Sequence, residues 1–274
     1  MAHAIAIRRL QVATLLLLAA ASGNGPLAGA VTSEVPLVRE ERTVTVDGVK
    51  ETWRLVWQEP PEPECDAASL GWFTCPCAGF AFGEKGNLDL VRLRGGREVE
   101  RLLLTPLFGP DSDFDGQVIV PRFPVRKDDL DAGVDGQEEL EADVPKRPVV
   151  KIMELRDYDH DGQATEFFLQ IASLPCAKEM GIVIGVSRRR PALHAFGTIE
   201  NPDKPLLLLR SHWADLARAK GSIQRLLWAC GDHGSDERTD VFLRADAHGI
   251  HASRRDYECR EDGGRGPIVR EEWL

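Results

Sequence analysis

Alternating apolar and polar residues predict antiparallel hairpins in the first half of the chain. In "RTVTVDGVKETWRLVW", at 42–57, the alternation runs on both sides of an Asp-Gly pair at 47–48, which is typical of a two-residue hairpin turn. A second hairpin is predicted over 87–108, where two alternating arms flank the Gly-Gly pair at 95–96. The proline-rich stretch "EPPEPEC" at 59–65 predicts a rigid connector between the two hairpins.

Short apolar stretches predict further strands in the second half of the chain. "VVKIMEL" at 149–155 and "EFFLQIA" at 166–172 are predicted to form two strands on either side of an aspartate-rich loop. Three later stretches, "SIQRLLWAC", "TDVFLRAD" and "GIHASRRDYEC", are separated by turn residues and predict a C-terminal meander. These elements favour a mainly β protein of antiparallel sheets, arranged as a sandwich or as a fragment of a propeller.

One helix is predicted over 212–220, where "HWADLARAK" has the spacing of an amphipathic helix. Ser211 can cap its first turn, and Gly221 can end it. The residues expected on its buried face are Trp213, Leu216 and Ala217. The pattern therefore predicts about one short helix in an otherwise β-rich fold.

A change of composition marks the segment 126–148. Its sequence, "RKDDLDAGVDGQEELEADVPKRP", is rich in charge and poor in large apolar residues. Such a composition favours a mobile acidic loop or a seam between two domains, because it offers little apolar surface to bury.

The first 30 residues have the three parts of a secretory signal peptide. Two arginines at 8–9 precede an uncharged apolar run at 10–21, and small residues follow at 26–30. The apolar run is short for a membrane span, which disfavours the alternative of a retained anchor. Residues 31–274 are therefore predicted to form a β-rich exported domain, secreted or periplasmic, that does not insert into the membrane after cleavage.

The cysteines, all of which lie beyond residue 30, predict disulfide bonds in an exported chain. Six cysteines allow fifteen pairings, and the sequence does not choose among them. Cys75 and Cys77 are too close in sequence to pair easily with each other, so each is expected to have its own partner. A zinc site at "CPC" is the alternative, but no histidine or cysteine lies nearby at zinc-finger spacing. The six are Cys65, Cys75, Cys77, Cys176, Cys230 and Cys259.

The chain is acidic, with a net charge of −10 that becomes −12 once the two arginines of the first 30 residues are removed. A charge of this sign repels nucleic acids and anionic membrane surfaces, so neither is an expected partner. It is compatible with bound cations. The expected partner is an unidentified protein or a glycan.

Candidate chemistry is concentrated in "RDYDHDGQATEF", where Asp157, Asp159 and Asp161 occupy every second position before a glycine. In an Asp-x-Asp-x-Asp-Gly loop the carboxylates surround one centre, and a bound cation relieves their mutual repulsion. The glycine permits a sharp turn, and Gln163 after it can offer a backbone carbonyl. Glu166 is the last carboxylate of the loop. We expect Ca²⁺ here, because Mg²⁺ requires fewer ligands in a stricter geometry.

Two related stretches extend the calcium hypothesis. In "DSDFDGQV" the same spacing recurs, although no acid follows the glycine within reach. A looser version, "DLDAGVDGQEE" with Asp129, Asp131 and Asp135, is better explained as a solvated acidic loop. All three stretches end their acidic part in Asp-Gly-Gln. In "DSDFDGQV" the candidate Ca²⁺ ligands are Asp111, Asp113, Asp115 and Gln117.

The run "DYDHDGQATEF" resembles the calcium-binding loops of extracellular FG-GAP and VCBS β-repeat proteins, in which the loop joins two strands. It is also similar to an EF-hand loop, but an EF-hand has flanking helices and a bidentate Glu at loop position 12. Here position 12 is Phe168, and the residues after the loop alternate as in a strand. In the repeat families the late acid comes one residue before Glu166, where this chain has Thr165. The resemblance is confined to this run and implies a calcium loop between strands.

No sequence motif identifies a catalytic site. "HGIH" at 248–251 lacks the acid of a metalloprotease motif, and "GVSRR" at 185–189 lacks the last glycine of a nucleophile elbow. "CGDHGSDE" at 230–237 contains residue types of a catalytic triad but is better explained as a polar hairpin loop near a disulfide. We therefore expect an exported calcium-binding protein, not an enzyme, whose calcium stabilises loops. The alternative is an extracellular hydrolase with a structural calcium.

Overall fold

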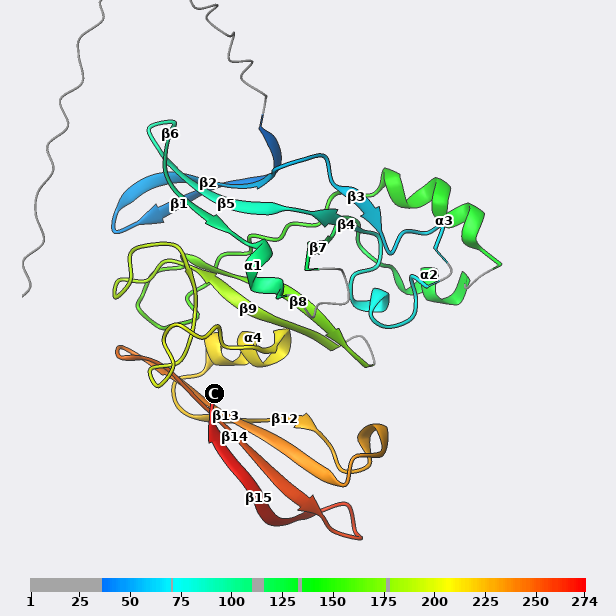
Figure 1. Cartoon of the computed structure of the whole chain (residues 1–274), viewed down its shortest axis with the longest axis vertical. Coiled ribbons are helices and arrows are strands. Elements are labelled where there is room, and N and C mark those ends of the chain that lie inside the picture. Colours follow the sequence, from blue (N-terminus) through cyan, green and yellow to red (C-terminus); the bar gives the residue numbers. More distant parts are fainter. Residues whose placement is uncertain (1–35, 70, 110–115, 133–134, 176–177) are drawn as a thin grey trace, which may run out of the picture. The chain divides into compact units, whose positions relative to one another are not determined.

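The computed structural model describes residues 36–274, apart from 70, 110–115, 133–134 and 176–177. The signal segment predicted at 1–30 lies outside the described residues. The described chain is mainly β, with antiparallel sheets and two disulfide bonds, which confirms the fold class expected from the pattern (Figure 1). Among the described residues, no helix is both long and apolar enough to cross a membrane.

Both predicted N-terminal hairpins are present in one four-stranded sheet, in the order β1-β2-β5-β6. All four turn residues, at 47–48 and 95–96, have the positive φ angles that a tight hairpin turn requires. The second hairpin ends earlier than predicted and is followed by a short helix, α1 (Thr105–Phe108). The strands are β1 (Leu37–Val46), β2 (Val49–Trp57), β5 (Leu88–Arg94) and β6 (Arg97–Leu103).

A second sheet contains the strand that follows the aspartate-rich loop. Its order is β10-β9-β11, with β8 paired to β9. The prediction of a strand in "EFFLQIA" is confirmed, because β8 begins at Glu166 and includes all of that stretch. The strands are β8 (Glu166–Leu174), β9 (Lys178–Gly185), β10 (His194–Ala195) and β11 (Leu208–Leu209).

The prediction of a strand over 149–155 is wrong. This segment forms no ladder, and only the next residue, Arg156, pairs with Glu166 in an isolated bridge. The reason is competition from a side chain, because Glu40 Oε2 accepts hydrogen bonds from the backbone N–H groups of Ile152 (2.6 Å) and Met153 (3.3 Å). Of the residues in this segment only Met153 is buried, and Val149 is 45% exposed.

The predicted C-terminal meander is confirmed and gains a fourth strand. Its order is β12-β13-β14-β15, with antiparallel neighbours throughout. The fourth strand gave little periodic pattern, because almost all of its residues are exposed and its ladder with β14 holds it in place. The strands are β12 (Ile223–Trp228), β13 (Glu237–Asp246), β14 (Gly249–Cys259) and β15 (Arg265–Trp273).

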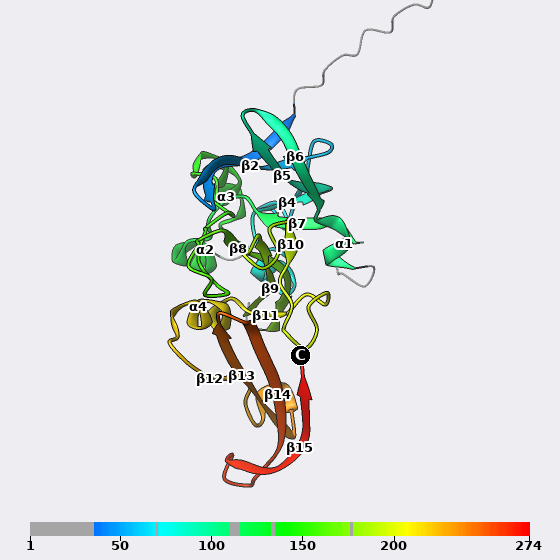
Figure 2. The same ribbon diagram turned by 90° about the vertical axis from the view of Figure 1, so that its left-hand side faces the viewer.

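The predicted helix is present as α4 (Arg210–Arg218), two residues earlier at its start than expected. The prediction of Ser211 as the N-cap is wrong, because the helix already includes this residue and has no side-chain cap. Its buried face is as predicted, since Trp213 and Leu216 have no exposed surface. Figure 2 shows α4 beside β9 and β13, both of which it contacts.

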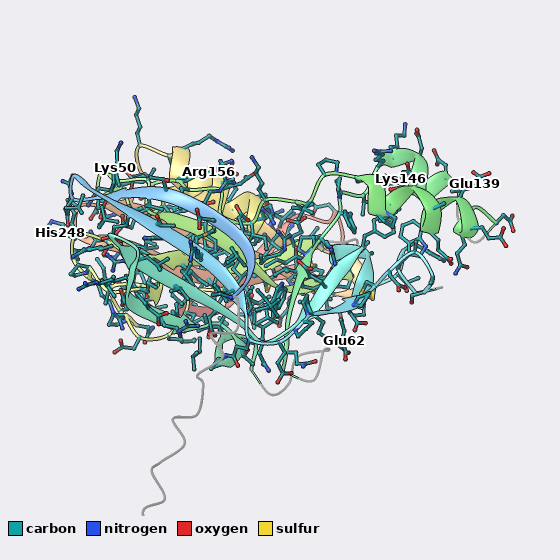
Figure 3. The ribbon with its side chains drawn as sticks, turned by 90° about the horizontal axis from the view of Figure 1, so that it is seen from above. Lys50, Glu62, Glu139, Lys146, Arg156 and His248 are labelled. Atoms are coloured by element: carbon teal, nitrogen blue, oxygen red, sulfur yellow. A yellow bond between two sulfur atoms is a disulfide. The ribbon has the colours of Figure 1, made fainter. Side chains whose placement is uncertain are left out.

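A third, smaller sheet has three strands in the order β3-β4-β7. The acidic segment 126–148, for which composition favoured a mobile loop or a domain seam, contains two short helices. The side chains of Glu139 and Lys146 extend outward from this segment (Figure 3). The elements are β3 (Glu62–Glu64), β4 (Gly83–Gly86), β7 (Val118–Pro121), α2 (Lys127–Ala132) and α3 (Gln137–Asp143), with the 3₁₀ turns η1 (Cys77–Gly79), η2 (Val144–Lys146) and η4 (Asp232–Gly234).

The paired strands β8 and β9 are buried on both faces. On one face, Phe167 packs in a hydrophobic cluster that includes Trp53 of the first sheet. On the opposite face, Phe168 packs in a cluster with Trp213 of α4 and Val241 of the C-terminal sheet. This double burial explains why β8 is a continuous apolar run in the sequence, where a half-exposed strand would alternate.

Candidate metal centre

The aspartate-rich loop is closed at its base by a backbone pair. The N–H of Arg156 donates to the carbonyl of Glu166 (2.8 Å), and the N–H of Glu166 donates back (3.2 Å). Within the loop, Gly162 has a φ of +89°, as expected for the glycine of this motif. Glu166 is therefore the first residue of β8, and its side chain is free to turn back toward the loop.

Three of the predicted ligands converge at this position. Asp157, Asp159 and Glu166 each contribute a carboxylate oxygen, and these oxygens lie within 4.8 Å of one another. Asp159 and Glu166 have no exposed surface. The Glu166 carboxylate accepts hydrogen bonds from the N–H of Tyr158 (2.7 Å) and from the hydroxyl of Thr165 (2.8 Å). A compact group of carboxylates, two of them fully buried, is thus built between the loop and the start of β8.

The other two predicted ligands of this loop have different partners. Asp161 accepts from the backbone N–H groups of Arg188 (2.6 Å) and Gln163 (2.8 Å). The Gln163 side chain exchanges two hydrogen bonds with Asp47, in the β1–β2 turn. Neither side chain belongs to the group of converging oxygens. The role predicted for Gln163 involves its backbone carbonyl, which the side-chain contacts leave available.

The electrostatic environment disfavours ionisation of the buried carboxylates. Burial, with the nearby negative charges of Asp159 and Asp161, raises the pKa of Glu166 to about 9, against the opposing hydrogen bond from Tyr158 N–H. Burial and the Asp161 charge raise the pKa of Asp159 to about 6, although Arg189 lies 2.6 Å away and opposes this shift. Among the described residues, Arg189 is the one ion-pair partner of the three carboxylates. One positive charge therefore faces three acidic groups.

The loop is attached to three separate elements. His160 is hydrogen-bonded through Nε2 to the carbonyl of Leu216 in α4 (3.0 Å). Gln163 attaches the loop to the β1–β2 turn, and Asp161 attaches it to the backbone of the 187–190 turn. The conformation of this loop is therefore coupled to parts of the chain that are distant in sequence.

The second predicted calcium loop is only partly described. Asp111, Asp113 and Asp115 lie outside the described residues, and Gln117 is half-buried just before β7. In the looser acidic stretch, a buried Asp129 binds Arg147 through two hydrogen bonds of 2.6 and 2.7 Å. An arginine thus neutralises the first acid of that stretch, which was expected to be solvated.

The disulfides bear on the zinc alternative. Cys65 is bonded to Cys77, so the sulfurs of that pair are not thiolates that could bind zinc. The second disulfide joins Cys230 to Cys259, as expected for a polar loop beside a disulfide. Cys75 is exposed, and the described residues contain no disulfide partner for it. Its remaining candidate partner, Cys176, lies outside the described residues.

The residue types that resembled a catalytic triad in 230–237 have other partners. The hydroxyl of Ser235 donates to the carbonyl of Glu237 (2.7 Å). Asp232 forms an ion pair (3.0 Å) with Lys178, the first residue of β9 in the second sheet. These bonds account for the two groups as parts of a structured turn.

Sequence reasoning missed the contribution of Arg189 to the candidate metal centre. Its only signal in the sequence is the run "RRRP" at 188–191, a cluster of positive charge in an acidic chain. The structure places Arg189 on Asp159, thirty residues away in sequence.

No family model, curated protein or solved structure matches this chain.

Proposed function

We propose that this protein is an exported calcium-binding β-rich protein, in which Ca²⁺ at Asp157, Asp159 and Glu166 stabilises the loop. The observation that supports this proposal is the convergence of three carboxylates, two of them fully buried, of which only Asp159 is paired with an arginine among the described residues. Burying a carboxylate is costly unless it is protonated or neutralised by a positive charge. A divalent cation neutralises the group and restores oxygen coordination to each side chain.

The donor set fits a hard cation. All three converging groups are carboxylates, and hard oxygen donors suit Ca²⁺ or Mg²⁺ better than zinc or copper. Ca²⁺ takes six to eight oxygens, and the Asp161 carboxylate and the Gln163 carbonyl of the same loop could complete that number. The binding chemistry on the protein side consists of deprotonating Glu166 and releasing Asp159 from Arg189.

A structural role for the ion follows from the attachments of the loop. The loop contacts the β1–β2 turn, α4 and the 187–190 turn, so an ordered loop holds three elements in place. A ligand that binds only the folded protein stabilises it by mass action. The disulfides support export, because such bonds persist in oxidising compartments.

The proposal is tested by thermal unfolding of the metal-free protein with added Ca²⁺ or with EDTA. Ca²⁺ is expected to raise the melting temperature, and Asp159→Ala is expected to remove most of that increase. Asp203→Ala is the matched control, because it removes an exposed carboxylate that is far less buried than Asp159. A melting temperature of the unaltered protein that is the same in millimolar Ca²⁺ and in EDTA would overturn the proposal.

A further inference from the structure

Among the described residues, no strand pairs with the outer edge of β8, on the side away from β9. A ladder begins there with Arg156 opposite Glu166, but it does not continue. The orientation of the edge is set by two observations. Glu166 directs its N–H and C=O toward Arg156, and the carbonyl of Val183 accepts from Phe196 on the far side of β9 (2.9 Å). In an antiparallel pair, two directly opposed residues direct their backbone N–H and C=O groups either toward each other or away from each other. Val183 directs its groups away from β8, so the backbone groups of Phe168, which lies opposite Val183, are directed away from β9.

Backbone groups at two alternate positions therefore face this edge. By the two-residue period of a strand, Phe168 and Gln170 direct their N–H and C=O groups outward. Within the described chain, these four groups have no hydrogen-bond partner. Both residues are nevertheless buried, with exposed fractions of 5% and 4%. Buried backbone groups are almost always paired in folded proteins, so this edge is suited to receive a partner.

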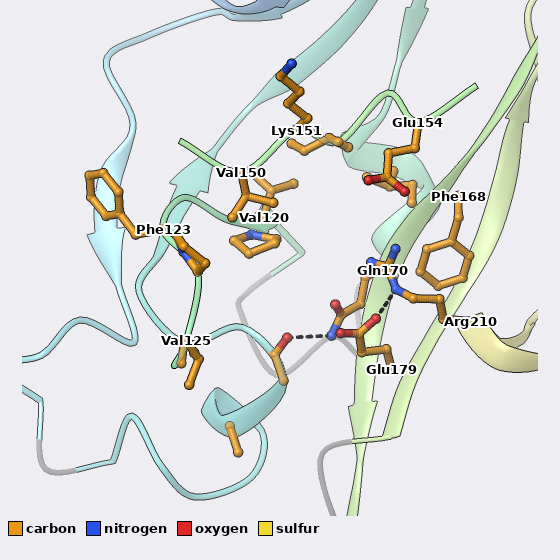
Figure 4. A pocket seen from close by; sticks show the side chains of 17 residues that line it. Val120, Phe123, Val125, Val150, Lys151, Glu154, Phe168, Gln170, Glu179 and Arg210 are labelled. Carbon is orange, nitrogen blue, oxygen red and sulfur yellow. Dashed lines mark hydrogen bonds and ion pairs between the residues drawn. The ribbon is translucent and has the colours of Figure 1, made fainter. Parts of the chain in front are cut away.

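A cavity of about 490 Å³ lies beside this edge (Figure 4). Continuation of the ladder from Arg156 would place Glu154 opposite Phe168 and Ile152 opposite Gln170, yet all four of these residues line the cavity instead. The edge of β8 and the segment 150–154 thus separate after the Arg156–Glu166 pair, and the cavity lies between them. Cavities of this volume are typical of binding sites for ligands.

The segment 150–154 is held away from β8 by its own hydrogen bonds. Val150 donates to the carbonyl of Arg122 (2.8 Å) and accepts from the Arg39 guanidinium (3.0 Å). The N–H groups of Ile152 and Met153 donate to Glu40. Pairing of the segment 150–154 with β8 would break these bonds. The gap is therefore a feature of the folded chain that the β1 region maintains.

We propose that this cavity binds an extended, positively charged segment of a partner protein, which adds to β8 as a further strand. The spacing of the unpaired groups selects an extended chain. Residues two apart in a strand are about 6.6 Å apart, and an added strand presents its own N–H and C=O groups with the same repeat. Pairing of this kind supplies affinity through the main chain, while pockets for alternate side chains supply specificity.

The lining of the cavity indicates the side chains that this segment carries. Val120, Phe123 and Val125 form an apolar wall, which suits alternate apolar residues. The Glu154 side chain extends toward the cavity, whereas Lys151 extends away from it (Figure 4). Glu179 and Arg210, at the far side, neutralise each other in an ion pair. The ion pair of Glu154 with Arg156 is long (3.8 Å), and the Glu154 side chain stays 61% exposed. This carboxylate, on a chain with a net charge of −10, favours a cationic segment.

The test uses a fluorescent heptapeptide of alternating lysine and valine, with binding followed by fluorescence anisotropy. Two N-methylated forms, one altered at the lysines and one at the valines, each remove one of the two sets of N–H donors. One form is expected to bind at least tenfold more weakly than the other, because only one set faces β8. Equal binding of both forms, or equal binding of an alternating glutamate and valine peptide, would overturn the proposal.

A variant pair tests the protein side. Gln170→Pro removes the outward N–H and is expected to weaken binding at least tenfold, since proline is tolerated at strand edges. Gln170→Ala is the matched control, because it keeps the N–H and loses only the side-chain bond to the Gly79 carbonyl. Because both variants lose the side chain, the difference between them measures the N–H, and the proline variant is expected to bind at least tenfold more weakly than the alanine variant. Equal effects of the two variants would contradict an edge site.

Hydrogen exchange decides the question even if the proline variant fails to fold. In the free protein, the amides of Phe168 and Gln170 are expected to exchange faster than those of Phe167 and Leu169, which face β9. Bound peptide is expected to slow the first two at least tenfold. Equal protection of all four amides in the free protein would show that another part of the chain already covers the edge, and the proposal would be wrong.

Discussion

The Glu166 carboxylate is fully buried, and among the described residues no cationic side chain is paired with it. Its pKa is raised to about 9 by burial and by neighbouring acids, so in the ion-free protein it carries a proton at neutral pH. Its two hydrogen-bond donors, Tyr158 N–H and the Thr165 hydroxyl, leave it oriented toward Asp157 and Asp159. A metal ligand that is protonated before binding makes calcium affinity and pH interdependent.

Replacing Glu166 by glutamine is expected to separate its two roles. Calcium affinity measured by calorimetry should fall at least tenfold, about 1.4 kcal/mol, because a charged ligand is lost. In EDTA, urea unfolding should show stability equal to or above that of the unaltered protein, because glutamine resembles the protonated acid. Glu154→Gln, which alters an exposed carboxylate two residues before Arg156, should change neither quantity. If Glu166→Gln binds calcium with unchanged affinity, Glu166 is not a ligand.

Calcium affinity is expected to rise with pH, by about tenfold per unit between roughly pH 6 and 9. The physical reason is that Ca²⁺ must displace one proton from Glu166 throughout this range, whereas Asp159, with a pKa of about 6, is already ionised above it. Calorimetry in buffers of different ionisation enthalpy should detect the release of about one proton per ion at pH 7.5. Affinity that is independent of pH would contradict a protonated Glu166.

The same shift determines how the metal-free protein responds to pH. Its folded form retains the Glu166 proton up to about pH 9, whereas the unfolded chain releases it near the ordinary value of 4.5. The folded state therefore binds more protons over this window, and the contribution of Glu166 to stability decreases as pH rises from 4.5 to 9. Glu166→Gln should abolish this component when urea unfolding in EDTA is measured across the window.

At the scale of elements, the sequence predicted what depends on local pattern. Alternation and turn residues located both N-terminal hairpins, and the spacing around Gly162 located a loop in which three of five candidate ligands converge. The failed strand prediction has a long-range cause, because the segment 149–155 has strand composition but donates N–H groups of its backbone to Glu40. Partners that lie far away in sequence leave no periodic trace.

Cysteine pairing is an element-scale property that the structure leaves open at one position. Cys75 Sγ lies 3.6 Å from the carbonyl of Leu174, two residues before Cys176. We expect a third disulfide between Cys75 and Cys176, because both then have partners in an oxidising compartment. Peptide mapping of unreduced protein should recover this pair together with the two described bonds. Alkylation of Cys75 in denatured, unreduced protein would contradict it.

At the scale of the whole molecule, β8 and β9 belong to both large hydrophobic clusters. Phe167 packs with the first sheet, while its neighbour Phe168 packs with α4 and the C-terminal sheet. Loss of order in these strands would therefore expose both clusters at once. Sequence analysis could recognise the apolar run but not this sharing, because each face is completed by elements from opposite ends of the chain.

Unfolding is therefore expected to be cooperative across the described chain. Native-state hydrogen exchange in increasing urea should bring the most protected amides of β2 and β13 to the same opening free energy, because both strands depend on β8 and β9. Phe167→Ala, expected to cost about 3–5 kcal/mol, should lower both values equally. A decrease confined to β2 would indicate that the two clusters unfold independently.

The attachments of the aspartate-rich loop also constrain how the protein matures. Its contacts extend from Asp47 near the start of the described chain to Leu216 in α4, so they cannot all form on a nascent chain whose C-terminal third is still missing. The carboxylate group consequently acquires its final geometry late, after most of the polypeptide has been synthesised. If the chain is exported unfolded and binds calcium as proposed, the ion would reach the loop while it is being assembled and would favour the last step of folding.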